Sequence, residues 1–251
     1  MTTWELLKAP GTGIVLYIYG HVMLQALAYT AGMCRLSRDT GTPSSSPLTL
    51  TSTKTTVQPV ALYTPIHLGG FQFSPKQISL ALALAGASQA FWMIGAFPYL
   101  QRKTSTGSVL RGCCIAWPIE MMCYPIANEL LRADFRAAFW TLGAICVFFG
   151  SGIAMSFACV QLCLNDVAPS PSTLATLNAV ALTVTSGLRA LAPVGMTSLY
   201  AVGVKGGWLD GHLGWICLAF MGVLLNVSVR WLPASAEGDI REAAKVDDEE
   251  E

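Results

Sequence analysis

The chain has 251 residues, of which 53% are hydrophobic and only 12% are charged, and its formal net charge is zero. About a quarter of the residues of a typical soluble domain are charged, so this chain lacks the charged surface that keeps a large apolar protein dispersed in water. With a mean hydropathy of +0.52, the composition excludes an ordinary soluble domain and indicates that lipid surrounds most of the protein.

Six apolar stretches are close to the roughly 20 residues that a helix needs to cross a hydrocarbon core of about 30 Å. They cover residues 11–31, 79–99, 110–131, 137–163, 174–202 and 213–232. Because the strands of a membrane barrel would be about half as long, helices are the spanning structure that fits. The sequence therefore predicts an all-α transmembrane protein with a six-span membrane domain over residues 11–233. Residues 1–10 are expected to be a short cytoplasmic segment and residues 234–251 an acidic cytoplasmic tail.

The first span carries three polar residues, Tyr17, His21 and Gln25, at intervals of four positions. This spacing places them on one side of a helix, and we expect that side to line a pathway or pocket. His21 is either a proton carrier near neutral pH or a hydrogen-bonded packing residue.

Residues 32–70 form a long connection whose first part is rich in serine, threonine and proline. Such a composition cannot bury enough apolar surface to fold alone. The Lys and Arg residues of the shorter connections place both termini in the cytoplasm. The cations of the long connection then fall on the outer side, which nearly cancels this bias.

The next two spans each contribute one polar candidate. Gln89 of the second span is assigned to the same pathway as the polar side of the first. Glu120 of the third span, within WPIEMMCYP, lies between two prolines that loosen the helix. It is the strong candidate within a span for a proton site or for the counter-ion of Arg189 in the fifth span.

The eight cysteines predict neither a disulfide framework nor a metal site. No pair has C-x-x-C spacing, and no histidine lies near enough to complete a zinc set. Cys159 and Cys163 share a helix face, which permits a metal but is more typical of small apolar packing residues. We therefore expect no metal and no other cofactor.

The fifth span carries a cation in its apolar middle. Asn178, Thr185 and Arg189 are seven and eleven residues apart, so they align on one side of the helix. A charge at mid-bilayer costs about 2.5–3.5 kcal/mol on insertion scales and usually faces a bundle interior or an aqueous cavity. Arg189 either lines a water-filled path or is clamped to carbonyls or a carboxylate at a helix contact.

Small residues recur at every fourth position of the fourth and fifth spans, a pattern that lets helix backbones approach closely. We expect these faces to meet other helices. They comprise Gly150, Ala154 and Ala158 in one span and Ala175, Ala179, Thr183 and Gly187 in the other.

The sequence contains none of the motifs of a soluble catalytic site. It has no Gly-rich phosphate loop, no H-E-x-x-H and no G-x-S-x-G. An intramembrane enzyme would need a nucleophile or paired carboxylates at matching depth, and no such set is evident. A basic, aromatic-studded patch for nucleic acid is also absent from the sequence. We therefore expect neither an enzyme nor a nucleic-acid partner.

Two segments carry a resemblance to a known family. QPVALYTPIHLGGFQFSPKQI and NDVAPSPSTLATLNAVALTVTSGLRALAPVGMTSLY resemble the second half of major facilitator superfamily transporters, nearest the fungal drug:proton-antiporter-like and zinc-induced-facilitator-like branch. The matching positions are Asn165, Asp166, Ala168, Pro169, Leu174, Thr176, Leu177, Asn178, Ser186, Arg189, Ala190 and Pro193. The chain departs at Ala175, Ala179 and Ala192, where the family favours glycine.

The resemblance implies that the six spans correspond to helices seven to twelve of a twelve-helix transporter. Spans one, two, four and five would line a central cavity, with His21, Gln25, Asn178 and Arg189 facing it. Glu120 would lie on a supporting helix and be a poorer candidate. Such a protein would be a multi-pass integral membrane protein that moves a small solute, with protons as a candidate coupling ion. No targeting motif separates the plasma membrane from the vacuolar membrane.

The resemblance also implies that this chain is a fragment, the C-terminal half of a secondary transporter. These transporters work by rocking two six-helix halves around a central site, so activity would require the missing N-terminal half or a second copy. Residues 33–56 interrupt a segment that otherwise matches the family continuously, and they are either a retained intron or an extracellular loop. The alternative function is a non-transporting membrane scaffold or receptor-like protein.

Overall fold

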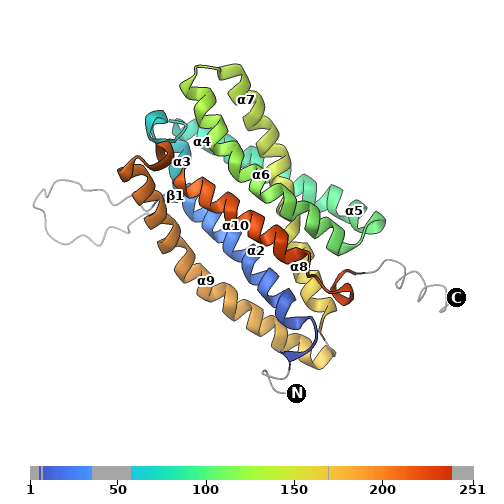
Figure 1. Ribbon diagram of the computed structural model, residues 1–251. Helices are drawn as coiled ribbons and strands as arrows, with labels where there is room; N and C mark the ends of the chain where they lie inside the picture. Colours follow the sequence, from blue (N-terminus) through green and yellow to red (C-terminus); the bar gives the residue numbers. More distant parts are fainter. Residues whose placement is uncertain (1–5, 7, 36–57, 169, 239–251) are drawn as a thin grey trace, which may run out of the picture.

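The computed structural model describes Leu6 and residues 8–35, 58–168 and 170–238, and within these residues long helical rods lie side by side in one bundle (Figure 1). Four rods are single helices, namely α2 (Thr12–Met33), α6 (Thr106–Arg132), α9 (Pro171–Gly206) and α10 (Leu213–Val229). Two are composite. The first joins α4 (Pro75–Phe91), the π-helical turn η2 (Trp92–Ala96) and α5 (Phe97–Lys103). The second joins α7 (Arg136–Ile145), the π-helical turn η3 (Cys146–Gly150) and α8 (Met155–Asp166).

The rods match the six stretches expected from the sequence, and the all-α transmembrane fold is confirmed. Four segments are long and apolar enough to cross a membrane, namely Thr12–Thr30, Pro75–Lys103, Arg136–Asp166 and Thr173–Gly203. α6 is too polar and α10, with 17 residues, is too short to be counted with these four. That these two helices also cross the bilayer stays a prediction.

The starts of two helices follow from local chemistry. Ser74 caps α4 with a capping box, because its hydroxyl accepts from the Gln77 backbone N–H while the Gln77 side chain accepts from the Ser74 N–H. Ser105 caps α6 in a similar way, since its hydroxyl accepts from the Ser108 backbone N–H at 3.2 Å. These caps satisfy N–H groups that have no partner within the helix.

The apolar core lies where α2, α6, α8, α9 and α10 pack together. Fully buried side chains from these helices fill it, among them Ile18, Val22, Leu110, Met121, Val160, Leu164, Leu177, Leu218 and Leu225. By contrast, α4 buries only Ile78 and Ser88. Its apolar surface is therefore left for lipid or for a partner outside this chain.

The small-residue faces of the fourth and fifth spans have different outcomes. Gly150 does pack against another helix, because a Cβ at this position would lie 2.6 Å from the Glu120 carboxyl carbon of α6. In the fifth span Ala175, Ala179, Thr183 and Gly187 are all exposed, so the described helices of this chain do not cover this face, and its contact with another helix stays a prediction. The face of α9 that packs in the core instead carries Leu177, Ala181 and Thr185. Spacing of four identifies a helix face, but it does not say which face the rest of the chain covers.

The ends of the long connection meet as two very short strands. β1 (Cys34–Arg35) and β2 (Gln58–Pro59) pair antiparallel, with Cys34 opposite Pro59. The short helix α3 (Val60–Tyr63) and the 3₁₀ turn η1 (Ile66–Leu68) then lead to α4. Residues 36–56 of the segment interpreted as a retained intron or an extracellular loop lie outside the described residues, as do residues 1–5, 7 and 239–251 of the predicted terminal segments.

A polar network joins the last turn of α6 to the connections that precede α4 and α10. Asn128 is fully buried and donates to the carbonyls of Ile66 and Gly70 at 3.0 and 2.6 Å. Arg132 reaches the carbonyls of η1 and of the 3₁₀ turn η4 (Trp208–Gly211). Backbone carbonyls of two connections are thereby satisfied by one helix end, which fixes the bundle at this end.

His212 adds a pH-sensitive contact to this network. Its ring is 7% exposed, and its Nε2 lies 3.4 Å from Glu129 Oε1. Burial lowers the pKa of His212 below its usual value, and the hydrogen bond with Glu129 only partly opposes this. The folded protein therefore binds a proton at this ring less readily than the unfolded chain does.

We expect acidification to destabilise the fold through His212. The unfolded ring gains its proton as the pH falls through about 6.5, whereas the folded ring resists it, so stability falls from pH 7.5 towards pH 5. Thermal unfolding in detergent should therefore show a flatter dependence of Tm on pH for His212→Gln than for the wild type. His67→Gln, at an exposed ring, is the matched control. Equal pH slopes for His212→Gln and the wild type would contradict this role.

Candidate transport pathway

Arg189 lies near the middle of α9 with an exposed side chain. Among the described residues it belongs to none of the ion pairs. Pro193, one turn later, has no N–H to donate, so the carbonyl of Arg189 loses its usual helical partner. The Arg189 side chain is thus exposed at a point of α9 where proline interrupts the helical hydrogen bonds.

The three polar residues predicted to share one side of α2 pass from an exposed to a buried environment along the helix. Tyr17 is 54% exposed, His21 is half-buried beside it with ring centroids 5.7 Å apart, and Gln25 is completely buried. Gln25 donates through Nε2 to the carbonyl of Leu218 on α10 at 2.9 Å. Successive positions four apart rotate by about 40° around a helix, which explains the change from an exposed to a buried environment. Gln25 thus takes part in a contact between α2 and α10, and its place in a pathway stays a prediction.

Thr185 also differs from its expected position. Its side chain is 4% exposed, and its hydroxyl donates to the carbonyl of Ala181 in the preceding turn at 3.0 Å. It lies on the side of α9 that packs in the core, whereas Arg189 lies on the open side. The three polar residues predicted to share one face of this span are therefore divided between two environments.

Asn178 belongs to a cluster of three amides between α8 and α9, which we call the amide cluster (Gln161, Asn165 and Asn178). Gln161 donates to the side-chain oxygens of Asn178 and Asn165 at 2.8 and 3.3 Å, and Asn178 donates to Asn165 at 3.4 Å. All three are half-buried. The sequence interpretation missed Gln161, although its spacing of four from Asn165 within an apolar span was a usable signal.

Glu120 does not pair with Arg189. Its carboxylate lies against Gly150 of η3, near Cys123 and Cys146. Gln89 is exposed on α4. The structure thus brings the predicted residues into separate groups, with Arg189, Tyr17 and Gln89 exposed on different helices.

The two π-helical turns hold the composite rods together. The carbonyl of Phe148 in η3 accepts from Ser88 Oγ at 3.0 Å and from Trp92 Nε1 at 2.7 Å. Ser151, just after η3, donates to the carbonyl of Ala85 on α4 at 3.3 Å. π-helical turns often occur at functional sites. Here two of them are in contact, and they belong to two spans that are predicted to line the pathway.

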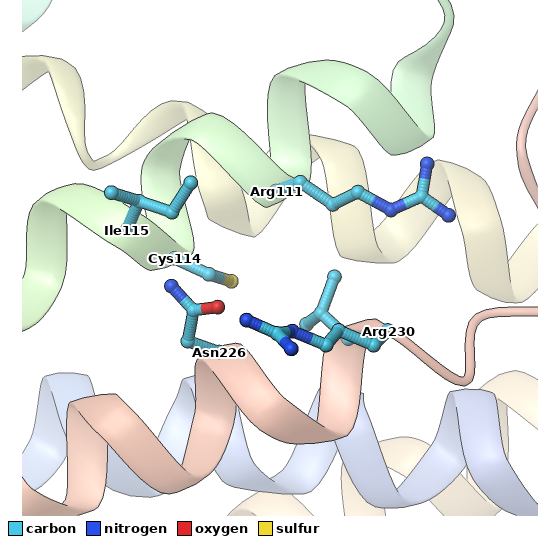
Figure 2. Close-up of a pocket in the computed structure, with 6 residues that line it drawn as sticks. Arg111, Cys114, Ile115, Asn226 and Arg230 are labelled. Atoms are coloured by element: carbon cyan, nitrogen blue, oxygen red, sulfur yellow. The ribbon is translucent and has the colours of Figure 1, made fainter.

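A separate cavity of about 160 Å³ lies between α6 and α10 (Figure 2). Arg111 and Cys114 come from α6, and Asn226 and Arg230 come from α10. Arg111 forms an ion pair with Glu237, which ties the segment after α10 to the start of α6. None of the predicted pathway residues lines this cavity, so it is distinct from the exposed surface of α9.

One curated protein gives an independent comparison. The efflux pump azaK of Aspergillus niger is 36% identical to this chain over 236 residues, which are 94% of the chain and 45% of the relative. The chain therefore spans less than half the length of the relative it matches. No family model matches the chain, and no solved structure matches it.

This similarity and the apolar helices decide the class of protein. The chain is a multi-pass integral membrane protein. The matched relative is an efflux pump, of which this chain covers 45%.

Proposed function

We propose that this chain is one six-helix half of a major facilitator superfamily efflux transporter, which moves a small solute by alternating access against a second six-helix half. The observation that carries the proposal is Arg189, an exposed cation near the middle of an apolar span that forms no ion pair with the described residues. Against fatty tails it would cost about 2.5–3.5 kcal/mol, whereas a water-filled path between two halves would solvate it. The similarity to 45% of an efflux pump supports the same division into halves.

The exposed surface also suggests what such a path would offer a solute. Arg189 provides a charge and hydrogen-bond donors, and the partly exposed Asn178 provides an amide. The exposed small-residue face of α9, with Ala179 and Gly187, allows another helix or a solute to approach the backbone closely. Protons are the proposed coupling ion, and His21 is the proposed carrier.

The proposal is tested by completing the transporter. We would co-express this chain with the part of azaK that lies outside the matched region, and in parallel with a differently tagged second copy of this chain. The readouts are copurification from detergent and the export of a fluorescent amphipathic dye from yeast. We expect copurification with the azaK segment and lower dye accumulation than with either part alone. Copurification without export, or no copurification with either partner, would contradict the proposal and favour a membrane scaffold.

Gln25→Met separates a packing residue from a pathway residue in this assay. Met has nearly the same length, and the Leu218 carbonyl that loses Gln25 as a donor keeps its place within α10. The buried Gln25 Oε1 has no hydrogen-bond partner, so its removal relieves an uncompensated polar atom. We expect dye export by the assembled pair to change less than twofold and Tm to stay equal or rise. A tenfold loss of export would instead identify Gln25 as a pathway residue.

A further inference from the structure

A group of two thiols and one carboxylate links α6 to the π-helical turn η3. Glu120 and Cys123 are three residues apart on α6 and so are neighbours on its surface, and Cys146 is the first residue of η3. Their carboxylate oxygen and two sulfur atoms all lie within 4.8 Å of one another, and all three residues are half-buried. No other group of three or more potential metal ligands is this close among the residues that the structure describes.

The surroundings give this group the space and orientation that it needs. Gly150, the last residue of η3, lies on the same side as Cys146 and faces Glu120, where a Cβ would be only 2.6 Å from the carboxyl carbon. A glycine therefore leaves room for the carboxylate at this point. The π-helical turn changes the direction in which the side chains of this rod point, and such turns are frequent at functional sites.

The chemistry of the three ligands points to a soft divalent cation. Zn²⁺ binds thiolates at about 2.3 Å and carboxylates at about 2.0–2.2 Å, which places neighbouring ligand atoms of a tetrahedral site about 3.5 Å apart. Binding would draw the three ligand atoms, which lie within 4.8 Å of one another, to about that spacing. Thiolates select Zn²⁺ and related ions over Mg²⁺ and Ca²⁺. The described ion pairs include none with Glu120, so a bound cation would also compensate its charge.

We propose that Glu120, Cys123 and Cys146 form an intramembrane binding site for a soft divalent cation of the zinc class. Three protein ligands leave a fourth position for water or a solute, which is typical of open, exchangeable sites and differs from closed structural ones. The ion would join α6 to η3. Because η3 is hydrogen-bonded to α4 through the Phe148 carbonyl, the ion would stiffen the contact among three rods. This site does not depend on the proposed transport function.

The test uses the full chain, purified in detergent and fully reduced. We would titrate it with Cd²⁺ and follow the ultraviolet thiolate-to-metal charge-transfer band, then measure Zn²⁺ affinity by competition with a chromophoric chelator. We expect one ion per chain at this site. Cys146→Ser and Glu120→Gln should each weaken binding at least tenfold, and Zn²⁺ should raise Tm of the wild type but not of Cys146→Ser.

Two control variants locate the signal. Cys217→Ser removes a half-buried free thiol of α10, and Cys163→Ala removes a buried thiol of α8. Neither residue belongs to the proposed site, so both variants should keep the wild-type affinity. No stoichiometric uptake by the wild type would overturn the proposal. Equal uptake by Cys146→Ser and Glu120→Gln, or loss of uptake in Cys163→Ala alone, would overturn it as well.

Discussion

Gly70→Ala is expected to be among the most destabilising single substitutions in this protein, lowering stability by about 3 kcal/mol, the upper part of the range for overpacking. A Cβ at this position would lie 2.1 Å from the carbonyl oxygen of Thr64, a backbone atom that cannot rotate away. The Thr64 carbonyl is already fixed by the Gln72 N–H at 2.9 Å. The turn between Thr64 and Gly70 must therefore open, because the backbone on neither side of the contact can move alone.

The damage would spread from this turn to α6. The carbonyl of Gly70 accepts from the side-chain amide of Asn128, which is fully buried and cannot donate to water instead. Opening the turn thus removes one of the two acceptors of this buried amide, the other being the Ile66 carbonyl, and this adds to the steric cost. Thermal unfolding in detergent, followed by tryptophan fluorescence, should give a Tm about 6–12 °C below the wild type if the scaling for soluble domains of this size applies.

Gly86→Ala is the matched control. Gly86 lies inside α4, is exposed, and has no atom within 4 Å of the position of an added Cβ. Alanine favours a helix over glycine by up to about 1 kcal/mol, so this variant should be as stable as the wild type or more so. An equal loss of stability in both variants would show that the contact with the Thr64 carbonyl does not cause the destabilisation.

The course of the helices could be predicted from the sequence because length and apolarity are local properties. The six apolar stretches needed no knowledge of the rest of the chain, whereas the caps at Ser74 and Ser105 begin two of the helices before the stretches predicted from residues 79 and 110. The rotation of each helix could not be predicted in this way. Gln25 and Tyr17 share a face by spacing, yet one contacts α10 and the other is exposed. Which face is covered depends on the neighbouring rods.

The proposed cation site of Glu120, Cys123 and Cys146 could not be predicted from residue spacing, for a second reason. Glu120 and Cys146 lie on different rods, and their proximity depends on the relative height of α6 and η3. The π-helical turn adds to the difficulty, because it shifts the register of every later residue in its span. A pattern based on regular helical turns therefore misplaces Gly150, at the end of η3, relative to α6. The amide cluster could not be predicted for a similar reason, since Gln161 reaches Asn178 only because α8 packs against α9.

Arg189→Ala is expected to abolish export, with at least a tenfold loss in the assembled pair, while leaving the fold intact. In the proposed path Arg189 supplies a charge near the middle of α9, and no other described residue of this helix between 174 and 202 is charged. Arg189→Lys keeps the charge but loses the planar, forked geometry of the guanidinium, so partial export is expected. Ser186→Ala is the control on the same exposed surface, because the Ser186 hydroxyl only donates back to Leu182.

The effect on stability decides between the two interpretations of Arg189 that the sequence left open. If the guanidinium faces a water-filled path, its removal takes a charge out of the bundle, so Tm of Arg189→Ala should equal or exceed that of the wild type. If it is clamped to carbonyls, the substitution breaks charge-assisted hydrogen bonds worth about 1.5–3 kcal/mol, and Tm should fall. Its exposed side chain and the absence of an ion pair among the described residues favour the first result. Lost export with an unchanged or raised Tm would therefore identify a pathway residue, whereas lost export with a lowered Tm would identify a structural one.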